Sequence, residues 1–162
     1  MAESKEVRSK TPSAEEQFKG LIAKFEPKRR ALIRYVREAL RKRFPSADEL
    51  VYNYSNSLVI GYSGTERGSD AVVAISSGAD GLRLYFNQGP TLPDPAKILL
   101  GSGKQTRFIH IESPATLRLP EVEALLDTAT GRAKVPFRPS GRGKLVIKST
   151  SAKDRPRRKP KP

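Results

Sequence analysis

The chain has 162 residues, a formal net charge of +14 and no cysteine. This length is typical of one domain with terminal extensions, and the lack of cysteine excludes disulfides, thiolate metal sites and thiol nucleophiles. No run approaches the ~18 apolar residues that a membrane span needs, and the N-terminus lacks the apolar stretch of a signal peptide. We therefore expect a cytoplasmic protein that does not engage a membrane.

The positive charge is concentrated in two segments. Residues 131–162 hold twelve basic residues and one acidic residue, and residues 13–45 hold ten basic and four acidic residues. Residues 46–130 instead hold six basic and ten acidic residues. An argument from charge to a nucleic-acid partner therefore applies only to the two basic segments.

Two helices are predicted near the N-terminus, after a polar stretch, residues 1–12, that we expect to be disordered. Ser13 and Glu16 form a capping box, and apolar residues at helical spacing predict the first helix over 14–25. A second helix is predicted over 28–43. On this helix the apolar residues and a stripe of four arginines point in different directions, so the helix can dock on a core and show cations outward.

The sequence changes to strand patterns from residue 48 onward. Short runs rich in β-branched and aromatic residues predict five strands, at 50–55, 57–63, 71–76, 82–87 and 106–112. The connections between the first four are too short for helical crossovers, so the predicted sheet is mainly antiparallel. Asp94-Pro95 is typical of a helix start and predicts a short helix over 96–100 that ends at Gly101. A last helix is predicted over 120–130.

These elements predict an α+β fold. An antiparallel sheet of about five strands is packed by two N-terminal helices, a short inserted helix and a C-terminal helix. We expect the domain to span residues 13–133. Residues 134–162 are expected to form a basic, largely disordered tail that could contain a short strand at 144–148, because so few apolar residues cannot offset the entropy of ordering the chain.

Four motifs occur in order along the chain: NYSNSLVIGY (53–62), TERGSD (65–70), LPDPAK (92–97) and GSGKQ (101–105). Together they resemble the YdhG-like family, a set of small, mostly bacterial domains of unknown function. The resemblance covers roughly residues 20–130, and GRGKLVIKS (141–149) is similar to a C-terminal extension of one branch. The resemblance to this family implies a fold in which helices pack on an antiparallel sheet. One relative is described as a frataxin-like iron chaperone, which makes iron handling an alternative function with no ligand residues carried over.

Two loops are candidates for a ligand pocket. Loop 64–70 places hydroxyl, acidic and basic groups between two strands, where a rigid scaffold could hold a ligand; the alternative is a hydrogen-bonded turn. Loop 101–105 lacks the first glycine and the Ser or Thr of a P-loop, so it is a looser anion site or a turn into a strand. The only histidine is a further candidate, although a lone histidine is more often structural. The candidate pocket residues are Glu66, Arg67, Asp70, Lys104, Arg107 and His110.

Nucleic-acid binding is the second hypothesis. Its candidate residues are the arginine stripe and the end of the tail: Arg30, Arg34, Arg37, Arg41, Arg155, Arg157, Arg158 and Lys159. They could neutralise phosphates of DNA or RNA without reading sequence, because no known base-reading motif is present. The alternative is a solvated helix face and a solubilising tail.

The expected function is that of a non-catalytic binding module for a small molecule or a protein partner, without a cofactor. A nonspecific nucleic-acid-associated protein is the first alternative and an iron-handling chaperone is the second. An enzyme is not favoured, because neither a nucleophile–base pair nor a set of metal ligands can be read from the spacing of the residues.

Overall fold

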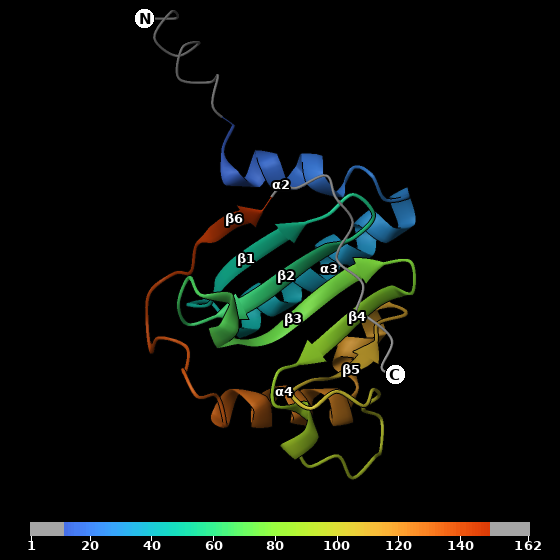
Figure 1. Cartoon of the computed structure of the whole chain (residues 1–162), viewed down its shortest axis with the longest axis vertical. Coiled ribbons are helices and arrows are strands. Elements are labelled where there is room, and N and C mark those ends of the chain that lie inside the picture. The colour runs from blue at the N-terminus through green and yellow to red at the C-terminus, as the bar shows by residue number, and fades with distance from the viewer. Residues whose placement is uncertain (1–11, 150–162) are drawn as a thin grey trace, which may run out of the picture.

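The computed structural model describes residues 12–149 and is shown in Figure 1. Its helices are α2 (Ala14–Ile22), α3 (Pro27–Arg43) and α4 (Pro120–Gly131), with short 3-10 helices η1 (Gly68–Asp70), η2 (Gly89–Thr91) and η3 (Pro114–Arg118). Its strands are β1 (Asp48–Asn53), β2 (Leu58–Ser63), β3 (Ala71–Gly78), β4 (Gly81–Phe86), β5 (Arg107–His110) and β6 (Leu145–Ser149). The disorder expected at the two ends of the chain falls outside the described residues.

The N-terminal helices follow the local signals of the sequence. The Glu16 amide donates to Ser13 Oγ at 3.1 Å and the Ser13 amide donates to Glu16 Oε1 at 3.0 Å, so the predicted capping box is confirmed. The first helix ends at Ile22, three residues before the predicted end. Pro27 both separates the helices and starts α3, because proline lacks only an amide proton that the first turn leaves unpaired.

The sheet is mixed rather than purely antiparallel, which corrects the prediction. Its six strands have the order β5-β4-β3-β2-β1-β6, and every pairing is antiparallel except that of β6 with β1. The strand considered at 144–148 is therefore the sixth strand, and residues 134–149 are part of the fold. Short connections force antiparallel neighbours, but the β1–β6 pair is separated by some ninety residues, so connection length could not predict its direction.

The short inserted helix predicted over 96–100 is absent, so the described part has one α-helix fewer than predicted. Lys97 has a φ of 57°, a left-handed backbone conformation that ends any right-handed turn. The Asp94 carboxylate accepts hydrogen bonds from the amides of Ile98 and Leu99, so it closes a turn instead of capping a helix. Leu100 exchanges backbone hydrogen bonds with Phe108 and lies along the edge of β5.

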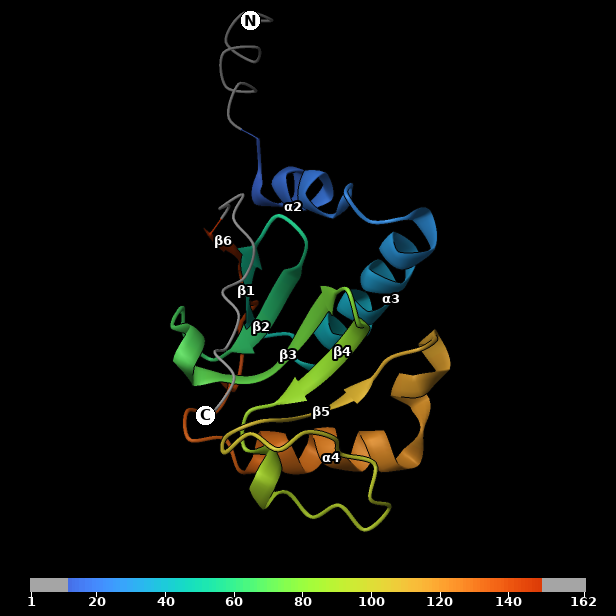
Figure 2. The ribbon, with the colours of Figure 1, turned by 45° about the vertical axis from the view of Figure 1, so that its right-hand side comes forward.

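The core lies on one face of the sheet. Along β4 the side chains of Leu82, Leu84 and Phe86 are buried, whereas those of Arg83 and Tyr85 between them are half-buried. The three α-helices contribute buried side chains to the same cluster as the buried strand residues. Figure 1 looks onto the opposite face, and Figures 1 and 2 agree that α3 crosses behind the strands.

Hydrogen bonds to the Asp48 side chain hold the segment that contains β6 against the sheet. This carboxylate is 1% exposed; it accepts a hydrogen bond from the Lys144 amide at 2.9 Å and one from the Arg138 guanidinium at 3.2 Å. Burial by itself would raise the pKa of Asp48, but these hydrogen bonds and the nearby positive charges outweigh it and lower the pKa below 3.8. The ionised carboxylate therefore stabilises the folded chain.

We expect this carboxylate to contribute to acid unfolding. Because its folded-state pKa is lowered, its contribution is fully present above about pH 5 and is lost as the pH falls through the folded-state pKa. Urea denaturation measured from neutral to acidic pH should show a shallower fall in stability for Asp48→Asn than for the unmodified chain. Equal acid dependence in the two proteins would show that Asp48 titrates as it does in the unfolded chain.

Candidate functional site

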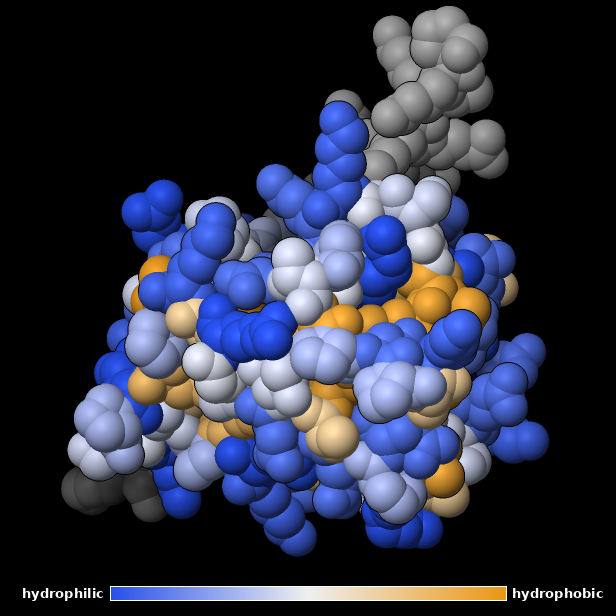
Figure 3. Space-filling model, turned by 90° about the horizontal axis from the view of Figure 1, so that it is seen from below, coloured by the Kyte–Doolittle hydropathy of each residue, from blue (hydrophilic) through white to orange (hydrophobic). Residues whose placement is uncertain are grey.

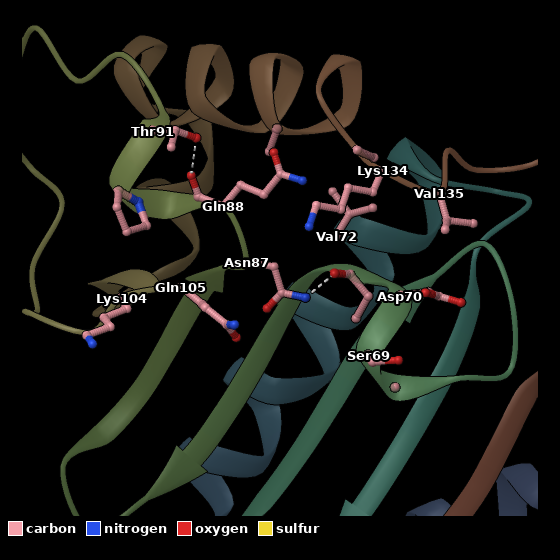
Figure 4. A pocket seen from close by; sticks show the side chains of 15 residues that line it. Ser69, Asp70, Val72, Asn87, Gln88, Thr91, Lys104, Gln105, Lys134 and Val135 are labelled. Carbon is pink, nitrogen blue, oxygen red and sulfur yellow. Dashed lines mark hydrogen bonds between the residues drawn. The ribbon is translucent and has the colours of Figure 1, made fainter.

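A cavity of about 610 Å³ lies at the α4 end of the sheet. It is lined by four segments that are distant in sequence, at 68–72, 87–91, 104–105 and 129–135. Figure 4 shows it between α4, η1 and the loop that carries Lys104. This volume is within the range of small-molecule sites in proteins.

The cavity combines an apolar base with a polar rim. Val72 and Ala129 are each only 6% exposed and supply apolar surface, whereas Ser69, Lys104 and Lys134 are exposed. Figure 4 shows the Gln88 and Lys134 side chains below α4, and both line the cavity. The rim therefore offers amide, hydroxyl and ammonium groups around a less polar floor.

The polar rim also includes one carboxylate, Asp70. Its Oδ2 accepts a hydrogen bond from the Thr65 hydroxyl at 2.8 Å, and the Thr65 hydroxyl in turn accepts the Arg67 amide at 3.0 Å. These contacts are the hydrogen-bonded turn that was the alternative for loop 64–70. Two lysines against one carboxylate leave the lining with a positive balance.

Hydrogen bonds between distant segments hold the walls. The Asn87 side chain donates to the Ala71 carbonyl, and the Asn87 amide donates to the Val72 carbonyl at 3.1 Å. The Arg132 guanidinium at the end of α4 donates to the Thr91 carbonyl at 2.6 Å. These hydrogen bonds fix the segments that form the walls relative to one another.

The structure brings two of the six candidate pocket residues to the cavity. Asp70 and Lys104 line it. Arg107 is not part of the lining; it donates to the Thr106 carbonyl at 2.9 Å and to the Gly103 carbonyl, so it holds the loop that carries Lys104.

The other three candidates lie elsewhere. Glu66 pairs with Lys144 at 2.9 Å, and Arg67 is 78% exposed. His110 ends β5 and lines a separate, shallower hollow that also includes Glu112. The position of a residue in one of the two candidate loops therefore did not predict whether its side chain lines the cavity.

Sequence reasoning missed four polar lining residues that lie outside the two candidate loops, Asn87, Gln88, Thr91 and Lys134. Asn87 was read as the end of a strand and Lys134 as the beginning of a tail, and neither belongs to a motif. Only the docking of the α4 end onto the β4–η2 connection brings them together.

The arginine stripe is mostly engaged within the molecule. Arg37 is 8% exposed and donates two hydrogen bonds to Glu49, both at 2.9 Å, and two to Glu15, at 2.9 and 2.7 Å. Arg41 lies 3.7 Å from Glu49, and Arg30 donates to backbone carbonyls. Arg34 is exposed. The tail residues of the same hypothesis, Arg155, Arg157, Arg158 and Lys159, lie outside the described residues.

The buried centre of this arginine network is Glu49. It is 4% exposed and also accepts a hydrogen bond from the Tyr62 hydroxyl at 2.8 Å. Burial, together with the adjacent Glu49 carboxylate, raises the pKa of the Tyr62 hydroxyl well above its ordinary value, so this hydroxyl stays a donor. The network joins α2, α3, β1 and β2, and its position indicates a structural role.

Comparisons with protein-family models, with curated proteins and with solved structures give no match to the chain. The resemblance to the YdhG-like family therefore stays a prediction. Within residues 12–149 no three His, Asp or Glu side chains lie together in a way that could hold a metal ion. No helix in this described part is long and apolar enough to cross a membrane.

Proposed function

We propose that the protein is a non-catalytic binding module whose cavity holds a small, polar molecule with an anionic group. The observation that carries the proposal is the cavity of about 610 Å³, which hydrogen bonds between distant segments hold in shape. Lys104 and Lys134 would attract the anion, and the amide groups of Gln88 and Gln105 would fix the orientation of the rest.

The chemistry of the lining favours binding over catalysis. Its hydroxyl groups, on Ser69 and Thr91, have no imidazole beside them, because His110 lies outside the lining. Asp70 is the single carboxylate of the lining and is hydrogen-bonded to Thr65. An activated nucleophile needs a neighbouring base, and paired acid–base catalysis needs two titratable groups with different pKa values.

A small molecule is favoured over a protein partner at this end of the molecule. Figure 3 shows hydrophilic side chains over most of the surface seen from below, with smaller apolar areas between them. Stable protein interfaces have an apolar centre that is depleted of charge. A protein partner and iron handling stay predictions without assigned residues.

A thermal-shift screen with nucleotides, sugar phosphates and dicarboxylates tests the proposal. A ligand at about 100 times its Kd adds about 2.7 kcal/mol of stability, which corresponds to a rise in Tm of about 5 °C or more for a chain of this size. Ser69→Trp, which fills the rim, and Lys104→Glu, which reverses a charge, should abolish the shift. Lys42→Glu, on an exposed position of α3, should preserve it.

Two results would contradict the proposal. One is that no compound of these classes raises the Tm. The other is that the shifts persist unchanged in both Ser69→Trp and Lys104→Glu, because the ligand would then occupy another place on the chain.

A further inference from the structure

An aromatic cluster lies on the face of the sheet opposite the core. Tyr85 of β4 pairs with Phe108 of β5, and Arg83 pairs with His110. The Tyr85 and Phe108 ring centroids are 5.2 Å apart, and those of Phe108 and His110 are 5.5 Å apart. We call these four side chains the aromatic face. None of them is buried, and His110 is exposed.

Arg83 holds the aromatic face together. Its guanidinium carbon lies 4.2 Å from the centroid of the Phe108 ring. The same group donates to the Tyr85 hydroxyl and to Asp80, both at 3.1 Å. The cation and the rings therefore form one fixed surface instead of separate mobile side chains.

The neighbouring strands extend this surface with small side chains. Val59 of β2 and both Ala74 and Ser76 of β3 lie on the same face and are half-buried. Figure 1 shows this face in front of the strands, with α3 behind them. The aromatic face is thus bordered by small side chains, and its own side chains are half-buried at Arg83, Tyr85 and Phe108 and exposed at His110.

We propose that the aromatic face binds single-stranded DNA or RNA by stacking bases on Tyr85, Phe108 and His110. Single strands are held in this way on sheet surfaces and in open grooves, where bases stack on aromatic rings and on arginine planes. A duplex does not offer its bases to such a surface. This site is separate from the cavity and from the arginine stripe of α3.

Charge complementarity favours a nucleic acid over an uncharged partner. The chain has a net charge of +14, and residues 150–162 hold six basic residues and one acidic residue. β5 and β6 both run parallel to β1, so they end at the same end of the sheet. Five strand spacings separate them, about 24 Å, and the thirteen residues after β6 can reach about 40 Å. The basic segment is therefore long enough to contact the backbone of a strand on the aromatic face.

Fluorescence anisotropy with labelled oligothymidine and oligouridine of about 15 nucleotides tests the proposal, with a duplex of the same length and inorganic polyphosphate for comparison. Phe108→Leu and Tyr85→Leu keep an apolar side chain and the net charge but remove the ring. Each should lower single-strand affinity by roughly 5- to 100-fold and leave polyphosphate binding unchanged. Tyr35→Leu, on the exposed side of α3, is the matched control and should have no effect.

Photocrosslinking with bromouridine-substituted oligonucleotides provides a second measurement that does not depend on a variant folding well. The crosslinked peptides should contain residues of β4 or β5. Crosslinks confined to other segments, or unchanged single-strand affinity in both leucine variants, would overturn the proposal. A duplex bound as tightly as the single strand would also overturn it, because phosphate attraction alone would then explain binding.

Discussion

Replacement of Arg37 by methionine is expected to lower the free energy of unfolding by about 3–5 kcal/mol. The guanidinium makes four hydrogen bonds to Glu15 and Glu49, and Glu49 is 4% exposed. Without Arg37 the buried carboxylate keeps the Tyr62 hydroxyl as its hydrogen-bond donor, and Arg41 remains 3.7 Å away. A buried charge that loses its main partner costs far more than an exposed ion pair contributes.

Two further variants separate this cause from a general weakening of α3. Arg34→Met, at an exposed position of the same helix, should stay within about 0.5 kcal/mol of the unmodified chain. The double variant Arg37→Met/Glu49→Leu should lose less stability than the sum of the two single variants, because no orphaned carboxylate remains. Urea denaturation measures all of these values. A loss below about 1 kcal/mol for Arg37→Met would show that the network does not hold the helices to the sheet.

A chain that ends at Ala133 is expected to lose at least about 3 kcal/mol of stability. The deletion removes Phe137, whose ring lies 4.8 Å from that of Phe44, and the two β6 residues Leu145 and Ile147 that pack against the core. It also removes both hydrogen-bond donors of the buried Asp48 carboxylate.

A chain that ends at Ser149 is the matched control for this truncation. It loses all six basic residues beyond β6 but keeps every contact described for that strand, so its stability should stay within about 0.5 kcal/mol of the full chain. Equal denaturation midpoints for the two truncated chains would contradict the packing of β6. The comparison also bears on nucleic-acid measurements, because only the chain that ends at Ser149 loses charge without losing a strand.

Local signals account for the elements that could be predicted from sequence. The capping box at Ser13 and the alternating burial along β4 depend on residues within a few positions of each other. The short connections between the first four strands likewise fix their antiparallel pairing. The same reasoning failed over 96–100, because an Asp-Pro pair starts turns as well as helices and Lys97 leaves the helical region.

Distant contacts account for what could not be predicted. β6 pairs with a strand some ninety residues before it, and the cavity is lined by four separate segments. The spacing of the arginine stripe predicted cations that point outward, but Arg37 is 8% exposed, and the sequence does not show that Glu15 and Glu49 pair with it. A stripe of charged residues predicts an exposed charged surface only where no oppositely charged side chain from another helix or strand pairs with it.

The most direct test of the proposed function is an amide NMR titration of the isotope-labelled protein with the compound that gives the largest thermal shift. A ligand in the cavity should perturb amides of 68–72, 87–91, 104–105 and 129–135, and leave β6 and the N-terminal half of α3 unchanged. Perturbations confined to the aromatic face on β4 and β5, or spread evenly over the whole protein, would contradict a ligand site in the cavity.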